Sequence, residues 1–476
     1  MVNNNYKNWL EKLLEALMNI FFLCALISTL YVLTSAFNGI TRIILFVVEV
    51  TIFSIIVYFY KNKIKKILNK ILLLIDKLNC KEMLLIICLL IIVLKVVYYC
   101  FYNFDATQDG DIQLYNKIAN QIIETGSLRS NAISHLFGVA CHLALFKYIK
   151  LPIQIGILIV FLIGTIINFF SFKSIIGKDK AFLLVLAYVL MPSSILLTFC
   201  PTHEIFLYMY LSLCLFALNR LINCDKKNRM VLYSFLIVLF SILACFVNPS
   251  GYIMWIIIGL CLVFSNIKIN KKIILLICLV LAICGFNLLK TSLHINEKVT
   301  ELNTYTILIH GSNPESLGEQ VDRYPMRRMR EYIFSNNMEM NDENLIIAAR
   351  YVLFDQYKYL LTHPINLIKL LAHKFYILWS GNHYSIEMAY VYNAFGSVTY
   401  YTMLVLSALI YLFILTVGIV YKKSKSFDIC VTNYKLAILG CFGVTILSIV
   451  TNKYSLYVTL FIYFLSFYRI DIDDNK

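Results

Sequence analysis

The chain has 476 residues, of which 60% are hydrophobic and only 14% are charged, and its formal net charge is +15. A soluble domain carries roughly a quarter of charged residues, so the composition excludes an ordinary soluble protein. The apolar residues form blocks of about 17 to 25, the length at which a helix crosses a bilayer. We therefore predict an all-α polytopic membrane protein.

The basic residues are concentrated in alternate connections between the apolar blocks. The positive-inside rule makes such connections cytoplasmic, which predicts a multi-pass protein of the cell membrane with both termini in the cytoplasm. The positive charge then reflects topology and attraction to anionic membrane lipids, and no nucleic acid partner is expected. The basic stretches are Lys61–Lys81, Lys173–Lys180, Arg220–Arg229, Lys268–Lys272 and Lys422–Lys435.

Hydropathy and charge together predict about 12 transmembrane helices. They are expected near 13–36, 42–60, 83–101, 152–172, 181–199, 204–219, 231–247, 252–267, 273–290, 398–420, 434–450 and 455–468.

This order divides the chain into four parts. Residues 1–81 form an N-terminal transmembrane hairpin with its basic cytoplasmic loop, and residues 82–290 form a transmembrane core whose first outer loop is 102–151. Residues 291–397 form a large extracytoplasmic loop, and residues 398–476 form the last crossings and a short tail. Six of the seven prolines lie at or beyond the outer ends of the crossings. Because proline ends helices and redirects the chain, we expect the functional site on the outer face.

The outer segments contain amphipathic helices. Apolar residues follow helical spacing in 104–126, which ends at a glycine, and in a short interfacial helix at 135–149. The large outer loop holds two more, Asn344–Leu361 and Ile365–Trp379, separated by Pro364.

Three aspartates lie within seven positions just after the third apolar block, at Asp105, Asp109 and Asp111. Asp111 precedes a predicted helix, so it can be an N-cap. The sequence TQDGD suits a turn, which would make Asp109 an ordinary loop residue. Crowded carboxylates also raise one another's pKa, which suits a general base that works near neutral pH. Spacing alone leaves these interpretations open.

Four further residues are candidates for binding a phosphorylated substrate. Glu204 follows His203 at the start of a crossing, where a carboxylate either faces a polar cavity or is a solvated group that favours the helix dipole. Lys374 and Lys453 are natural partners of a phosphate. Their alternatives are snorkelling from an interfacial helix for Lys374 and an ordinary loop cation for Lys453.

Other polar and aromatic residues have structural interpretations that we favour. Trp379 and Tyr384 could stack on a sugar, but interfacial aromatic residues are common. His135 and His142 share a helix face without an acidic or cysteine partner, so we expect solvated histidines and not a metal site. Lys95 lies well inside the third crossing and is expected to snorkel.

Several motifs occur in an order that resembles the membrane glycosyltransferases of GT-C fold, which include protein O-mannosyltransferases and bacterial lipid A aminoarabinose transferases. Asp109 and Asp111 are separated by Gly110, where that family often has adjacent acidic residues, and Lys453–Tyr454 stands where many members have arginine–tyrosine. The matching features are Asp111, Tyr115, Ala119 and Gly126 at similar spacing, Phe137–Gly138, the basic turn Lys173–Gly177, Glu204, the turn Pro249–Gly251, and the helix HPINLIKLLAHKFYILW that ends at Trp379.

The resemblance implies a GT-C-like fold and inverting transfer of a sugar from a polyprenyl-phosphate donor to a lipid, glycan or protein acceptor on the extracytoplasmic face. Asp111 would be the catalytic base, with Asp109 as the second choice. No metal site is assigned, and a requirement for a divalent cation stays open. The residues expected to bind substrate or phosphate are Lys374, Lys453, Glu204, His203, Tyr115 and Trp379.

Two alternatives remain. A polysaccharide polymerase or ligase acting on polyprenyl-diphosphate-linked glycans would depend on outer-loop arginines, for which Arg323, Arg327, Arg328 and Arg330 are available. A transporter or flippase would have charged or broken spans near the midplane, and only Lys95 and Pro192 fit that description.

Overall fold

The computed structural model is built from α-helices and short connections, without a strand in the part that it describes. The described residues are 2–34, 37–101, 110–126, 134–264, 267–293, 297–319, 321, 323–379, 386–421, 428–448 and 456–470.

Each of the twelve predicted crossings corresponds to a helix or a broken helix. Within the described residues, nine helices are long and apolar enough to cross a membrane, and a bent pair makes a tenth. Two shorter apolar helices, α11 (Ile253–Phe264) and α19 (Leu456–Tyr468), match the two remaining predictions. The nine long helices are α1 (Val2–Leu33), α2 (Gly39–Ile75), α3 (Cys80–Phe101), α6 (Ile153–Ile176), α9 (His203–Asn223), α10 (Lys227–Val247), α12 (Ile269–Ser292), α17 (Ile386–Val420) and α18 (Ile429–Leu447). The prediction of an all-α polytopic membrane protein is confirmed.

The fifth predicted crossing, 181–199, is not a straight helix. It consists of α7 (Lys178–Leu190), followed by α8 (Pro192–Leu196) and the 3-10 turn η1 (Leu197–Phe199), and the two parts are bent by 72°. Met191 is extended, with φ −72° and ψ 121°, as expected for a residue that precedes proline. Hydropathy cannot detect this bend, because both parts are apolar.

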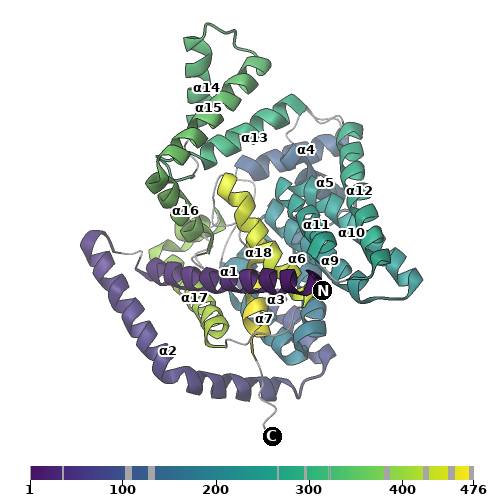
Figure 1. The fold of residues 1–476 in the computed structure, drawn as a ribbon, viewed down its shortest axis with the longest axis vertical. Helices are drawn as coiled ribbons and strands as arrows, with labels where there is room; N and C mark the ends of the chain where they lie inside the picture. Colours follow the sequence, from purple (N-terminus) through teal and green to yellow (C-terminus); the bar gives the residue numbers. More distant parts are fainter. Residues whose placement is uncertain are drawn as a thin grey trace.

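The helix α2 is longer than the predicted crossing 42–60. It continues through most of the basic stretch that we expected to be a loop. Leu68 and Leu72 are each only 1% exposed, whereas Lys66 and Lys70 are exposed. The stretch is therefore an amphipathic extension of the crossing, and Figure 1 shows it running along the lower edge of the molecule.

The five basic stretches meet at one end of the bundle, which we call the basic end. Lys178 contacts Asp76 at 3.2 Å, and Lys268 contacts Asp225 at 3.3 Å. Asn223 Nδ2 donates to Cys430 Sγ at 3.3 Å, which joins the ends of α9 and α18. Glu15 of the first helix also lies here, because it pairs with Lys435 at 2.9 Å and with Arg469 at 2.5 Å. The shared location of these stretches agrees with the charge pattern.

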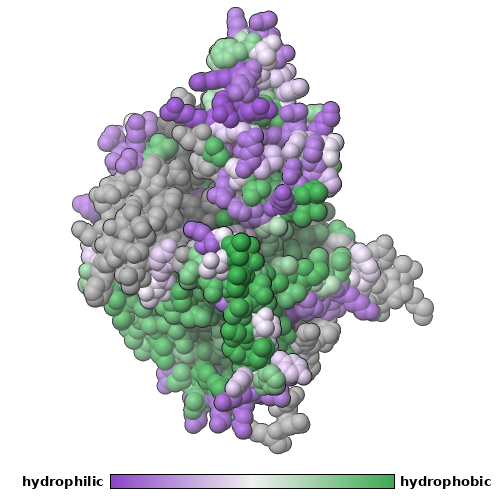
Figure 2. Space-filling view, turned by 90° about the vertical axis from the view of Figure 1, so that its left-hand side faces the viewer, coloured by the Kyte–Doolittle hydropathy of each residue, from purple (hydrophilic) through white to green (hydrophobic). Residues whose placement is uncertain are grey.

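The opposite end carries the amphipathic helices and a separate lobe. The predicted pair 344–361 and 365–379 is confirmed as α15 and α16. Figure 1 shows the lobe of α13 to α15 at the top, and Figure 2 shows it as largely hydrophilic above an apolar band. The lobe has its own hydrophobic core. The elements at this end are α4 (Gly110–Thr125), α5 (Ser134–Tyr148), η2 (Pro249–Tyr252), α13 (Glu297–Gly311), α14 (Tyr324–Ser335), α15 (Asp342–Thr362) and α16 (Pro364–Trp379).

Candidate active site

The end of the broken span is held by a charged side chain from another crossing. Lys95 of α3 is only 8% exposed, and its Nζ donates to the carbonyl oxygens of Thr198 at 2.6 Å and Gln154 at 2.8 Å. The Gln154 side chain donates to the carbonyl oxygen of Phe199 at 2.9 Å. Lys95 therefore does not snorkel. Its ammonium joins the Thr198 carbonyl oxygen, in the turn that ends the broken span, to the Gln154 carbonyl oxygen in the first turn of α6.

The next helix begins with a buried pair of ionisable residues. Glu204 lies in the first turn of α9 and is 0% exposed, and His203 is 8% exposed. Glu204 Oε1 lies 3.1 Å from His203 Nε2. The interpretation of Glu204 as a solvated carboxylate is wrong, because water does not reach it. A carboxylate at a helix N-terminus is favoured by the helix dipole. Because η1 is only a few residues earlier, the Lys95 contact also fixes the position of this pair.

The short helix α5 connects α4 to α9. Lys147 donates to Asn120 of α4 at 2.7 Å. His142 is hydrogen-bonded to the Gly138 carbonyl oxygen at 2.6 Å and to the Tyr210 hydroxyl of α9. The prediction of a solvated His142 is therefore wrong, since the ring packs between α5 and α9. These bonds couple the helix that begins near Asp111 to the helix that begins near Glu204.

The first outer helix α4 starts at Gly110, one residue before Asp111, so the interpretation of Asp111 as the N-cap that precedes this helix is wrong. The backbone of Asp111 lies in its first turn, whereas the Asp111 side chain lies outside the described part of the structure. Tyr115, one turn later, is 2% exposed and belongs to the main hydrophobic core. Asp109 and Lys453 fall outside the described residues, so the roles assigned to them and to Asp111 stay predictions.

On α16, Lys374 is completely buried. Its Nζ donates to the carbonyl oxygens of Thr445 at 3.0 Å, Ile446 at 2.7 Å and Ser448 at 2.6 Å, at the end of α18. The snorkelling interpretation is wrong. Burial lowers the pKa of Lys374 to about 7. An ammonium has three N–H groups, and all three are used here to cap a helix. Lys374 would have to give up one of these carbonyl bonds to bind a phosphate.

Trp379 lies at the end of the same helix and is completely buried. Its ring packs edge-on against Phe21 of α1, with ring centroids 4.9 Å apart. This packing gives Trp379 a structural role between α16 and α1. Tyr384 lies outside the described residues.

Apart from Tyr115 on α4, the described members of the predicted site form two groups. His203 and Glu204 lie at the start of α9, and Lys374 and Trp379 lie where α16 meets α18 and α1. In the described part of the chain, no hydrogen bond or ion pair links one group to the other. The residues that sequence analysis missed are Gln154 and Tyr210. The sequence contained two signals of the Lys95 contact. Lys95 lies inside one apolar block, and Pro192 lies inside another.

Two further predictions concern metals and the outer-loop arginines. In the described residues, no three His, Cys, Asp or Glu side chains are placed to bind a metal ion, and Asp105 and Asp109 are not among those residues. Arg328 of α14 lies 3.5 Å from Glu331 and 3.9 Å from Asp355. This arginine is thus part of the charged surface of the lobe.

Comparisons with known proteins give one structural match. No family model and no curated protein matches the chain. A solved structure of ArnT from Cupriavidus metallidurans bound to undecaprenyl phosphate matches with 12% sequence identity and a TM-score of 0.33. The match covers 75% of this chain and 72% of that chain.

Proposed function

We propose that the protein is a membrane glycosyltransferase of GT-C type. It transfers a sugar from a polyprenyl-phosphate carrier to a lipid, glycan or protein acceptor, with inversion at the anomeric carbon. The reaction takes place on the extracytoplasmic face, at the end of the bundle opposite the basic end. Both termini then lie in the cytoplasm, and the four parts 1–81, 82–290, 291–397 and 398–476 are the domains of the enzyme.

The buried His203–Glu204 pair is the observation that carries this proposal. Ionisable residues inside a membrane protein are costly and usually mark a functional site. Here the pair follows a broken span whose end is fixed by Lys95 and Gln154. A fixed polar pair on α9, the helix that α5 contacts through His142 and Tyr210, suits the binding of a sugar ring. The order of the sequence motifs gives independent support.

The proposed chemistry needs a base and a cation. Asp111, at the start of α4, removes the proton from the acceptor hydroxyl, with Asp109 as the alternative. The hydroxyl oxygen attacks the anomeric carbon, and the bond from that carbon to the phosphate oxygen breaks. Lys453 is the proposed partner of the released phosphate, because the N–H groups of Lys374 cap α18.

The test is transfer of radiolabelled sugar from a panel of polyprenyl-phosphate sugars to membrane extract. Wild type is compared with Asp111→Asn, Asp109→Asn and Glu204→Gln at matched expression. Asn has the size of Asp but cannot accept the proton, so Asp111→Asn should abolish transfer. Asp109→Asn should retain it, and Glu204→Gln should weaken donor binding. Unchanged transfer in Asp111→Asn would show that this residue is not the base.

A transporter or flippase is the second candidate, and the broken span favours it. Broken helices near the midplane are typical of transporters. The two functions are separated in proteoliposomes that contain the purified chain. A glycosyltransferase modifies the acceptor, whereas a flippase moves the lipid-linked sugar between leaflets without changing it. Movement without transfer would replace the enzyme assignment.

A further inference from the structure

A cavity of about 420 Å³ lies at the basic end of the bundle, far along α9 from the His203–Glu204 pair. It opens between the ends of α6 and α9 and the start of α18. Its size falls within the range of small-molecule sites, which are roughly 300–1,000 Å³. The lining residues are Ser171, Ser174, Ile175, Phe216, Asn219, Arg220, Asn223, Asp428 and Cys430.

Buried hydrogen bonds between α6, α9 and α18 hold the polar side chains of this cavity in place. Ser171 and Tyr434 share a hydrogen bond of 2.6 Å between α6 and α18. Asn433 donates to the Asn219 side chain at 2.9 Å, which joins α18 to α9. Asn219 and Tyr434 are largely buried. The cavity is therefore a fixed feature where three helices meet, and its polar side chains are held in place.

Two opposite charges line the cavity. Arg220 lies over the ring of Phe216, with its guanidinium carbon 5.0 Å from the ring centroid, and it makes no ion pair with another described residue. One oxygen of Asp428 accepts the backbone N–H of Cys430 at 2.8 Å and caps α18. The Cys430 thiol also donates to the Asp428 carboxylate, whose two oxygens have further lone pairs that can accept an ammonium. The lining thus offers one cation and one anion, and a ligand that carries only negative charge would meet the Asp428 carboxylate.

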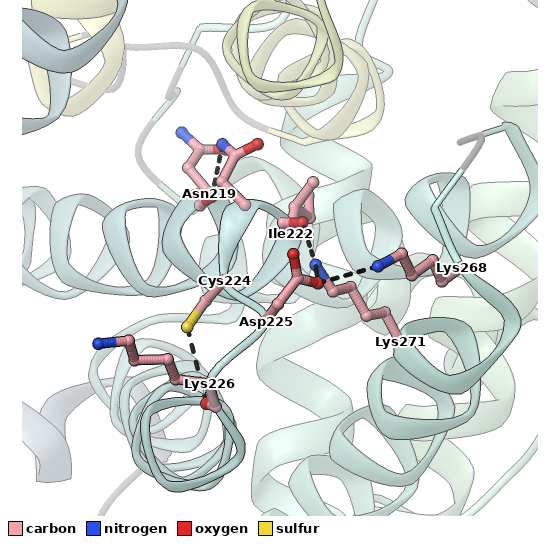
Figure 3. Close-up of polar contacts among 8 residues, drawn as sticks. Asn219, Ile222, Cys224, Asp225, Lys226, Lys268 and Lys271 are labelled. Atoms are coloured by element: carbon pink, nitrogen blue, oxygen red, sulfur yellow. Dashed lines mark hydrogen bonds and ion pairs between the residues drawn. The ribbon is translucent and has the colours of Figure 1, made fainter.

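The neighbouring lysines are already engaged. Figure 3 shows Lys268 and Lys271 directed at Asp225, which they contact at 3.3 and 3.2 Å. Lys271 also donates to the carbonyl oxygen of Ile222 at 2.7 Å. Lys226 extends away from this cluster in the same view. Of these cations, only Arg220 both lines the cavity and has its N–H groups available.

We infer that this cavity binds a phosphoethanolamine group, with its phosphate on Arg220 and its ammonium on Asp428. A guanidinium binds phosphate through two parallel hydrogen bonds, and a carboxylate oxygen accepts an ammonium N–H. The hydroxyl groups of Ser171 and Ser174 and the amide of Asn223 surround the rest of the ligand. Basic residues at the end of a membrane-protein bundle attract the headgroups of membrane lipids, and this cavity lies at the basic end. The site is separate from the proposed transferase site and does not depend on that activity.

Two sources can supply this chemistry, the headgroup of phosphatidylethanolamine and a soluble phosphoethanolamine ester. Binding is measured by native mass spectrometry of the full chain purified in detergent. The lipid probes are phosphatidylethanolamine, phosphatidylglycerol, which has no ammonium, and phosphatidylcholine, whose quaternary ammonium has no N–H to donate. Wild type should retain phosphatidylethanolamine in preference to the other two.

Arg220→Gln should weaken phosphatidylethanolamine binding about tenfold, since it removes a charge-assisted contact. Asp428→Asn keeps the cap of α18 and should remove the preference over phosphatidylcholine. Lys226→Gln is the matched control, because it removes a basic-end cation outside the cavity, and it should bind like wild type. Equal binding by Arg220→Gln and wild type would overturn the site. An equal loss in Lys226→Gln would also overturn it, since binding would then follow net charge.

The soluble arm uses phosphoethanolamine as a competitor of the bound lipid. Displacement by phosphoethanolamine supports the site and indicates that the ester alone is recognised. Binding of the lipid without such displacement supports the site and identifies the membrane as the source. If neither probe binds the wild-type chain, the inference is wrong.

Discussion

Replacing Lys95 by methionine tests whether the end of the broken span depends on one buried ammonium. Methionine has a similar length but no N–H group, so the carbonyl oxygens of Thr198 and Gln154 lose their bonds of 2.6 and 2.8 Å. These carbonyl groups lie in the interior, where no water replaces the lost donor. We expect the connection between η1 and α9 to loosen, together with the position of Glu204.

The size of the effect follows from the two hydrogen bonds. A hydrogen bond to a charged group contributes about 1.5–3 kcal/mol, so the gross loss is about 3–6 kcal/mol. Part of this is offset, because the methionine side chain is not charged and its burial carries no cost of desolvating an ammonium. We expect the free energy of unfolding to fall by about 2–4 kcal/mol.

The assay is unfolding of the purified chain by SDS in mixed micelles, followed by sugar transfer with the same sample. Lys70→Met is the matched control, because Lys70 is exposed on α2, and its stability should change by less than about 0.5 kcal/mol. A Lys95→Met variant as stable as this control would show that the ammonium contributes nothing to the broken span. The proposed placement of Glu204 by this contact would then be refuted.

Three further predictions concern the end of the bundle opposite the basic end. Gly318 has φ +86°, and a Cβ there would lie 2.4 Å from Lys374 Cε, so Gly318→Ala should destabilise the chain by about 1–3 kcal/mol in the same SDS titration; unchanged stability would contradict the close approach. The hydrogen bond from His373, 2.6 Å long, holds the pKa of Glu319 below its ordinary value of 4.5. The contact should therefore protect the backbone amides of 312–319 from hydrogen exchange above pH 4.5, and this protection should be lost as the pH falls through the lowered pKa of Glu319. Wild type and Glu319→Gln should then differ in hydrogen exchange at pH 6 and agree near pH 3. A difference that persists at pH 3 would rule out this pair as the cause. A Cβ on Gly138 would lie 2.4 Å from a carbonyl oxygen of α10. Gly138→Ala should therefore separate α5 from α10 and lower both the thermal unfolding midpoint and the rate of sugar transfer. Wild-type values of both would show that α5 moves to accommodate the methyl group.

Sequence and structure agree on the candidate site only in part. Glu204, at the start of α9, could be identified from the sequence, because an ionisable residue at the edge of an apolar block stands out in the sequence itself. Its burial could not be predicted, since a solvated Glu204 and a buried Glu204 have the same sequence. The role of Lys374 was likewise open, and its partners on α18 are more than 70 residues away along the chain.

The sequence by itself determined the fold class, the approximate positions of the crossings and the shared end of the basic connections. These properties depend on local composition, because a block of apolar residues enters the membrane whatever surrounds it. The tertiary structure decided how the spans are broken and joined. Pro192 indicates a possible break, but the ammonium that fixes it comes from Lys95, 103 residues away from Thr198. Contacts of this kind depend on which helices pack together. Helix packing depends on the complementary shapes of both partners, so the sequence of one helix alone does not determine it.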